Sequence, residues 1–286
     1  MIDYWLGIDG GGTGTRALLA LPDGTVLGRG HAGPSALGQG VESALRHVQQ
    51  AIASTFEIAG IAQPDRGRCA IGAGLSGIGN PVSRRAFEDG MAGWGRLVLE
   101  TDAFTMLLGA HQGRPGAMVA AGTGSVGEVL RADGTRFHAG GWGFPAGDEG
   151  SGAWIGLRAM AVAQCAMDGR AESGPLAEAI WSRCGSRRTD LQVWCANAAQ
   201  FAYAQLAPLV FDVAFHDAAA EQILVDAAHA LEALAHGLDP AGALPLAICG
   251  SVGQRLQSRF EPVLRARAVA PWVGPAEGAL LLLRNL

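Results

Sequence analysis

Charged side chains are scarce in this chain. Asp, Glu, Lys and Arg together make up 16% of its 286 residues, whereas apolar residues make up 49%. The net charge is −5, and no cluster of basic residues occurs along the chain. A protein that binds nucleic acid or an anionic membrane would carry a basic patch, so neither partner is expected. The high apolar content favours a well-buried core over disorder.

The chain also lacks a long apolar segment. No uncharged run reaches the roughly 20 residues that a membrane-spanning helix needs. A secretory leader would begin with a basic segment followed by an apolar one, whereas this chain opens on a predicted strand over residues 2–9. We therefore expect a soluble, cytoplasmic protein.

Cysteines are few and widely spaced. There are five of them, an odd number, and no Cys-x-x-Cys pair occurs. This argues against a disulfide framework and against a structural zinc site. We expect buried free thiols in a reducing cytoplasm, at Cys69, Cys165, Cys184, Cys195 and Cys249.

What the chain does contain is one short pattern used twice, 110 residues apart. The first copy reads Gly-Thr-Gly-Thr at 12–15 and Asp-Gly-Thr at 23–25, and the second reads Gly-Thr-Gly-Ser at 122–125 and Asp-Gly-Thr at 133–135. Each copy predicts a strand, a Gly/Thr-rich turn, a strand, an Asp-Gly turn and a third strand. Two such hairpins facing each other could clamp a phosphate chain, which indicates an ATP-dependent phosphotransferase built from two related lobes.

The rest of the sequence alternates between strand and helix patterns, which is typical of a mixed sheet with helices on its faces. Further strands are expected at 68–75, 96–101, 244–249 and 267–270. Helices are expected at 39–59, 81–92, 102–111, 252–260 and 275–286, with a helical region at 153–237 broken near 168–174, 184–189 and Pro208. The Gly-Arg-Pro-Gly at 113–116 favours a boundary between domains 1–112 and 113–286. The last helix is a candidate to pack back on the N-terminal lobe.

The first Gly/Thr-rich turn, residues 10–15, directly follows Asp9. Three successive glycines allow backbone N–H groups to point at phosphate oxygens, and the hydroxyls of Thr13 and Thr15 add donors. Asp9, at a strand end, is placed to hold a hydrated Mg²⁺. The pattern is neither a Walker A motif nor a Rossmann fingerprint, and a purely structural turn is the alternative. The second copy has Val119 at the position of Asp9, so only the first would bind metal.

Three other places allow a functional and a structural interpretation. Asp102 lies where a strand leads into a helix, so it could accept a proton from a substrate hydroxyl or simply cap the helix. Asp148 and Glu149 are adjacent acids in the Gly-rich loop 140–152, and could bind sugar hydroxyls or favour a helix N-terminus. The Gly-Ser-Val-Gly at 250–253 suits a contact to adenosine or the α-phosphate, or is an ordinary strand–helix turn.

Taken together, these motifs resemble the acetate and sugar kinase, Hsp70 and actin superfamily. Within it, the chain resembles the N-acetylglucosamine kinase and BadF/BadG/BcrA/BcrD ATPase family over nearly its whole length. The resemblance is carried by Gly-Ile-Asp-Gly-Gly-Gly-Thr at 7–13, Thr-Asp-Ala at 101–103, Gly-Thr-Gly-Ser at 122–125, Gly-Trp-Gly at 141–143, Gly-Asp-Glu-Gly-Ser at 147–151 and Gly-Ser-Val-Gly at 250–253. It implies a two-lobed, actin-like ATPase (ribonuclease H-like) α/β fold of duplicated domains, a cleft between them that closes on binding, and a homodimer.

The resemblance also implies an activity, the ATP-dependent phosphorylation of the 6-hydroxyl of an amino sugar such as N-acetylglucosamine. Asp102 would be the base that takes the hydroxyl proton, and Asp9 would organise Mg²⁺. Asp148 would bind sugar hydroxyls beside Glu149, with Gly124 lining the same site. The nucleotide and its phosphates would be held by Gly11, Gly12, Thr13 and Thr123, with Gly250 and Ser251.

Two departures from the family pattern bear on the substrate. Thr101 stands where the family usually has Asn, and Ala36 stands where it usually has an Asn that contacts the sugar. The missing amide leaves glucosamine or another hexosamine as an alternative. A BadF-type ATPase activator without sugar kinase activity is a second alternative, although none of the five cysteines lies in an iron–sulfur setting. A sugar-sensing regulator or filament-forming actin relative is a third, against which the intact Asp9 and Asp102 argue.

Overall fold

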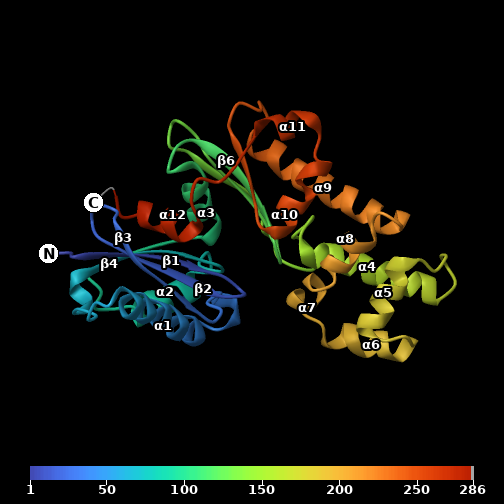
Figure 1. Cartoon of the computed structure of the whole chain (residues 1–286), viewed down its shortest axis with the longest axis horizontal. Coiled ribbons are helices and arrows are strands. Elements are labelled where there is room, and N and C mark those ends of the chain that lie inside the picture. The colour runs from blue at the N-terminus through green and yellow to red at the C-terminus, as the bar shows by residue number, and fades with distance from the viewer. Residues whose placement is uncertain (285–286) are drawn as a thin grey trace. The chain divides into compact units, whose positions relative to one another are not determined.

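The computed structural model describes residues 1–284 and divides into two compact units, each with its own sheet (Figure 1). Unit 1 comprises Met1–Gly116, Ala132–Gly134 and the chain from Ala270 onward. Unit 2 comprises Ala117–Arg131 and Thr135–Val269. The C-terminal end of the chain therefore belongs to the same unit as the N-terminal end.

The sheet of unit 1 has five strands in the order β3-β2-β1-β4-β5. The strands are β1 Tyr4–Gly10, β2 Thr15–Ala20, β3 Val26–Ala32, β4 Cys69–Leu75 and β5 Arg96–Glu100. The first three form an antiparallel meander, and β4 and β5 extend the sheet in parallel from β1. The C-terminal ends of β1, β4 and β5 therefore lie at one edge of the sheet.

Four α-helices cover this sheet, namely α1 Val41–Ala59, α2 Pro81–Gly90, α3 Asp102–His111 and α12 Pro275–Leu281, with 3-10 turns η1 Leu37–Gln39 and η2 Arg66–Arg68. The C-terminal helix α12 packs against α3 and β1, as Figure 1 shows. Small residues allow this close packing, because a Cβ on Gly278 would overlap the carbonyl oxygen of Thr105, and one on Gly7 that of Ala276. Helix α12 is thus part of the packed body of unit 1.

The sheet of unit 2 repeats that of unit 1, with the strand order β10-β9-β6-β7-β8. Its strands are β6 Gly116–Ala121, β7 Ser125–Leu130, β8 Arg136–Gly140, β9 Leu246–Cys249 and β10 Ala268–Val269. Strands β7 and β8 pair antiparallel, whereas β6, β9 and β10 pair in parallel. Since β7 and β8 begin 110 residues after β2 and β3, the duplication predicted from the repeated motif is confirmed.

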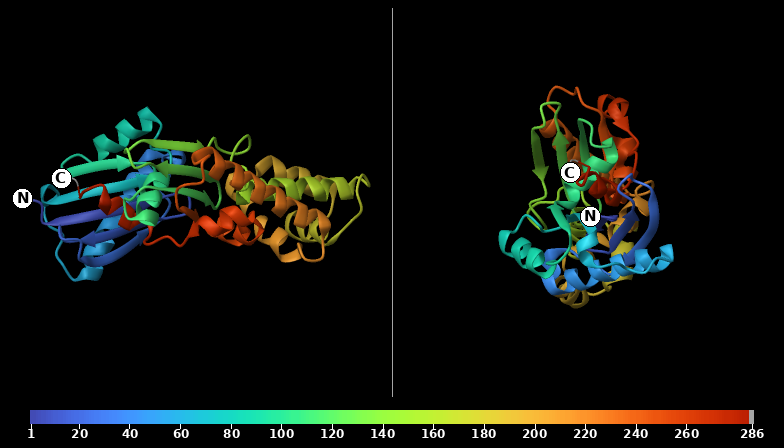
Figure 2. Two further views of the ribbon diagram at one scale, coloured as in Figure 1. Left: turned by 90° about the horizontal axis from the view of Figure 1, so that it is seen from above. Right: turned by 90° about the vertical axis from the view of Figure 1, so that its left-hand side faces the viewer.

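Unit 2 differs from unit 1 in its long helical part. Its helices are α4 Gly152–Met167, α5 Pro175–Cys184, α6 Arg188–Asn197, α7 Gln200–Ala204, α8 Ala207–Val213, α9 Ala218–Leu238, α10 Ser251–Leu256 and α11 Pro262–Arg267, with the 3-10 turn η3 Gln257–Arg259. Helix α9 packs on β7 and β8 and also on α4 and α8, and the helices α4 to α8 gather at one end of unit 2 (Figure 2). One apolar core runs from the strands through these helices and includes Val119, Val129, Ile155 and Leu231.

Several element boundaries differ from expectation. The helix expected at 39–59 begins at Val41, because Gly40 has a φ of 120° and separates it from the turn η1. The break expected near Pro208 is confirmed, because α7 ends at Ala204 and α8 begins at Ala207, and Pro208 lies in the first turn of α8, where its missing N–H is not needed. Helix α11 was not expected. The final helix, expected to reach 286, ends at Leu281, and residues 285–286 lie outside the described chain.

All five cysteines are free thiols, as expected, and Cys69, Cys184 and Cys249 are buried. Cys165 and Cys195 are only partly buried, so the expectation of burial is wrong for these two. Among the described residues, no helix combines the length and the apolar character needed to cross a membrane.

Candidate functional site

The first Gly/Thr-rich turn joins β1 to β2 at the edge where the parallel strands of unit 1 end. The amide of Gly11 donates to the carbonyl of Gly14 at 3.1 Å, and the carbonyl of Gly11 accepts from the amides of Ser35 and Ala36. Gly12 and Thr13 are exposed on this turn. The predicted phosphate-binding residues Gly11, Gly12 and Thr13 therefore lie on an accessible, backbone-fixed loop.

Thr15 does not take the role expected of it. Its side chain is buried, and its Oγ1 lies 2.6 Å from the carbonyl oxygen of Gly33 and 2.7 Å from the Oγ of Ser35. The hydroxyl thus ties the start of β2 to the loop after β3, and the expectation that it donates to a phosphate is wrong.

Asp9 and Asp102 lie close enough to influence each other electrostatically. Asp9 is the penultimate residue of β1, and its carboxylate pairs with Arg16 at 3.2 Å. Burial raises the pKa of Asp9 although Arg16 opposes the shift. Burial also raises the pKa of Asp102 to about 6. A hydrogen bond from the amide of Ala103 opposes this shift, whereas the negative charge of Asp9 adds to it. The two carboxylates thus lie within electrostatic range of each other at the strand ends of unit 1.

Asp102 is not the cap of its helix. Thr101 is the N-cap of α3, and its Oγ1 accepts a hydrogen bond from the amide of Phe104 at 3.1 Å. Asp102 is the first helical residue, so its carboxylate is not used as the cap, and that interpretation is wrong. The side chain of Ser76, which follows β4 directly, lies near enough to the Asp102 carboxylate to lower its pKa. Sequence reasoning missed Ser76, although its place at the end of a parallel strand was a usable signal.

The second Gly/Thr-rich turn, after β6, is held by the beginnings of two helices. The amides of Gly152 and Ala153, at the start of α4, donate to the carbonyls of Gly122 and Thr123 at 2.8 and 3.2 Å. On the other side, Gly250 has a φ of +78°, and a Cβ there would overlap the carbonyl oxygen of Ala121. Ser251 begins α10 directly after it. The structure thus brings together the residues predicted to bind nucleotide in unit 2: Thr123, Gly250 and Ser251.

The two acids of the Gly-rich loop have different surroundings. Asp148 is buried, has a φ of 61°, and its Oδ2 accepts a hydrogen bond of 2.6 Å from Nε2 of Gln200. Glu149 is exposed, and its backbone carbonyl accepts from the hydroxyl of Ser125. Neither acid lies in the first turn of α4, which is capped by Ser151, so the helix-dipole interpretation is wrong.

Gly124 lies against Asp148, because a Cβ on this glycine would come within 2.7 Å of Oδ2. The predicted sugar-lining residues Gly124 and Asp148 are therefore neighbours within unit 2. Gln200, which sequence reasoning missed, is 52 residues from its partner, and no local motif marks it.

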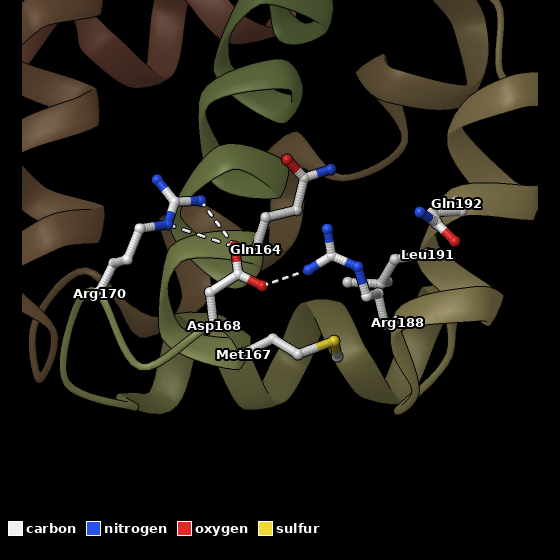
Figure 3. Close-up of a pocket in the computed structure, with 7 residues that line it drawn as sticks. All are labelled: Gln164, Met167, Asp168, Arg170, Arg188, Leu191 and Gln192. Atoms are coloured by element: carbon white, nitrogen blue, oxygen red, sulfur yellow. Dashed lines mark hydrogen bonds and ion pairs between the residues drawn. The ribbon is translucent and has the colours of Figure 1, made fainter.

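A pocket in the helical part of unit 2 contains none of the predicted residues. Figure 3 shows it between α4 and α6, where Arg170 and Arg188 both pair with the carboxylate of Asp168. These side chains are largely exposed and satisfy one another. The hollow therefore adds nothing to the candidate site.

Residues 1–284 contain no group of three or more His, Cys, Asp or Glu side chains placed to hold a metal ion. A single carboxylate such as that of Asp9 nevertheless fits Mg²⁺, which takes one or two carboxylates and completes its shell with water and phosphate oxygens. The donor set of unit 1 suits a magnesium ion that arrives with a nucleotide.

Two duplicated sheets, each with a Gly/Thr-rich turn between its first two strands, define the actin-like ATPase class of α/β proteins. A family profile described as the BadF/BadG/BcrA/BcrD ATPase family matches residues 6–282, and the chain belongs to this family. The predicted fold class and family are thereby confirmed.

Named relatives cover nearly the whole chain. It is 33% identical to "Glucosamine kinase GspK" of Vibrio cholerae serotype O1, over 98% of this chain and 95% of that protein. It is 26% identical to "N-acetyl-D-glucosamine kinase" of Dictyostelium discoideum, over 99% and 98%. A crystal structure from Chromobacterium violaceum, provisionally named as an N-acetylglucosamine kinase, superposes with a TM-score of 0.96 at 45% identity and covers 99% of each chain.

Proposed function

We propose that this protein is an ATP-dependent kinase that phosphorylates the 6-hydroxyl of an amino sugar, N-acetylglucosamine or glucosamine. The observation that carries the proposal is the Asp102 carboxylate, which is not used as a helix cap and lies beside Asp9. Membership of an ATPase family and relatives named as amino sugar kinases support it.

Asp102 is the general base in this proposal. A carboxylate with a pKa of about 6 is largely ionised at neutral pH and is still basic enough to accept a proton from a sugar hydroxyl. The freed oxygen attacks the terminal phosphorus of ATP in line, and the bond to the leaving ADP breaks. In such transfers positioning and charge neutralisation supply most of the acceleration, and the base contributes about 10²–10⁴-fold.

The nucleotide is assigned to the two Gly/Thr-rich turns. In unit 1, Gly12 and Thr13 offer donors to phosphate oxygens on an exposed loop, and Gly11, whose amide donates to Gly14 and shapes that loop, is assigned to the nucleotide with them. In unit 2, Thr123 does the same, and Gly250 and Ser251 are assigned to the nucleotide beside it. Asp9 would hold Mg²⁺, which supplies charge neutralisation of the phosphates when bound, and Asp102 stays free to act as the base.

The sugar is assigned to Gly124, Asp148 and Glu149 in unit 2. Asp148 is a buried carboxylate and can accept hydrogen bonds from sugar hydroxyls. Ala36 has no side-chain amide to offer a 2-acetamido group, and the Vibrio relative is named for glucosamine. The proposal therefore includes both an acetamido and an amino group at carbon 2 of the sugar. The free thiols fit a protein of the reducing cytoplasm. A homodimer is also part of the proposal, because the family resemblance implies it.

A coupled ADP-release assay with Mg·ATP tests the proposal. The acceptors are N-acetylglucosamine, glucosamine, N-acetylmannosamine and glucose, with a control lacking sugar. Release that depends on one amino sugar supports the kinase and identifies the preferred 2-substituent. Equal release with and without every sugar would instead favour the ATPase-activator alternative, and an iron–sulfur colour in the purified protein would add to it.

A further inference from the structure

Gln200 connects the helical part of unit 2 with the candidate sugar loop. It is the first residue of α7, and its Nε2 donates to Oδ2 of Asp148 at 2.6 Å. A Cβ on Gly124 would lie 2.7 Å from this Oδ2 and 3.2 Å from the Nε2 of Gln200. The amide of Gln200 therefore touches the two residues assigned to the sugar, although all three are far apart in sequence.

Helix α7 is held firmly enough to place this amide. Its Tyr203 packs on Phe144 of the Gly-rich loop, with ring centroids 5.3 Å apart, and on Trp194 of α6 at 5.0 Å. The backbone of Tyr203 also lies so close to Gly156 of α4 that a Cβ there would overlap its carbonyl oxygen. Helix α7, next to α4 in Figure 1, is thus fixed on two sides, and a side chain on a packed element is positioned more accurately than one on a free loop.

The carboxylate of Asp148 is held within unit 2 by the side-chain amide of Gln200, whose Nε2 donates to Oδ2. Burial raises the pKa of Asp148, and the nearby backbone amides of Ser125 and Gly143 and the side chain of Gln200 oppose this shift. An ionised carboxylate offers about four acceptor positions, so others than the one used by Gln200 are left for ligand hydroxyls. The direction of those positions depends on how the Gln200 amide holds the group.

We propose that Gln200 is a positioning residue of the sugar site, whose amide fixes the Asp148 carboxylate so that a free acceptor position of this carboxylate meets a sugar hydroxyl. This inference rests on the proposed function, because it assumes that Asp148 binds the sugar. A hydrogen bond to a charged group is worth about 1.5–3 kcal/mol, which corresponds to roughly 10- to 100-fold in binding. The inference adds a residue that no motif of the family resemblance contains.

Two variants and one control test the role. Gln200→Ala removes the amide, and Gln200→Glu keeps the size of the side chain but removes its N–H donors. The control is Gln222→Ala, because Gln222 donates to Asp226 at 2.9 Å on the exposed face of α9, a bond of the same kind away from the loop. For each protein, KM for sugar, KM for ATP, kcat and the melting temperature are measured with the preferred acceptor.

If Gln200 positions Asp148, both Gln200 variants raise KM for the sugar by about 10- to 100-fold and leave KM for ATP unchanged. Gln222→Ala changes neither. A lowered melting temperature with an unchanged sugar KM would show a structural role only and would overturn the inference. If the wild-type protein shows no sugar-dependent ADP release, the proposed function fails and the inference fails with it. If the wild-type protein is active and Gln200→Ala has the same KM for the sugar, only the inference fails.

Discussion

Thr101 and Phe104 are joined by a capping hydrogen bond of 3.1 Å, from the amide of Phe104 to the hydroxyl of Thr101. This bond satisfies one of the free amides at the start of α3. Because Thr101 supplies the cap, the next residue, Asp102, keeps its carboxylate available. The hydrogen bond from the amide of Ala103, 3.0 Å long, then orients that carboxylate, and the nearby Ser76 side chain lowers its pKa.

The first prediction concerns Asp102→Asn. The asparagine keeps the shape of the side chain but cannot accept the hydroxyl proton, so sugar phosphorylation should fall by about 10²–10⁴-fold. Nucleotide binding should remain, because the amide is neutral and the Gly/Thr-rich turns are untouched. Sugar-dependent ADP release and ATP binding by calorimetry measure the two properties separately. Unchanged turnover in this variant would exclude Asp102 as the base.

The second prediction separates the cap from the base. Thr101→Ala removes the cap of α3 and should lower the free energy of unfolding by about 1 kcal/mol. It should also lower kcat, because the backbone that carries Asp102 is then less well fixed. The matched control is Asn80→Ala, since Asn80 caps α2 by accepting from the amides of Val82 and Ser83. It should cost a similar free energy in urea unfolding but leave kcat unchanged. Equal kcat in both variants would show that the cap has no part in the reaction.

The repeat and the unit 1 site were predictable from sequence for a local reason. Gly/Thr-rich and Asp-Gly turns fix hairpins through neighbouring residues, so the two copies fold alike wherever they occur. Asp9 lies at the end of β1 and Asp102 follows β5, and the ends of such parallel strands lie at one edge of a sheet. Their proximity therefore followed from the order of the elements alone.

The unpredicted features depend on packing between distant segments. Whether Thr15 faces a phosphate or the protein is decided by the loop at Gly33 and Ser35, which no spacing rule places. The contact of Gln200 with Asp148 depends on how α7 packs on α4 and on Phe144. Thr101 stands where the family usually has Asn, but both residue types cap helices well. The substitution alone therefore did not predict a change in the local structure.

The third prediction is a pH profile. The Asp102 base must be ionised, and burial raises its pKa to about 6, so kcat/KM for the sugar should be constant above this value and fall about tenfold per pH unit below it. N-acetylglucosamine suits the measurement because it has no titrating amine. Ser76→Ala removes a hydrogen bond that lowers the pKa and should move the midpoint to higher pH. A midpoint near 4, or one that Ser76→Ala leaves in place, would contradict this assignment.

The fourth prediction concerns the contact between Gly250 and the second Gly/Thr-rich turn. Gly250→Ala would combine a φ of +78° with an overlap between the new Cβ and the carbonyl oxygen of Ala121. The control is Gly134→Ala, because Gly134 has a φ of +82° but open space around its Cβ position. The control should cost roughly 1–3 kcal/mol of unfolding free energy, from backbone strain alone.

Gly250→Ala should cost more than that, because either β6 or α10 must move to relieve the overlap. Since Ala121 directly precedes the turn that carries Thr123, the shift should also raise KM for ATP, whereas Gly134→Ala should leave it unchanged. Urea unfolding and ATP kinetics on the two variants measure these effects. If both variants lose the same free energy and keep the wild-type KM for ATP, the close approach of Gly250 to Ala121 is not what shapes the nucleotide site of unit 2.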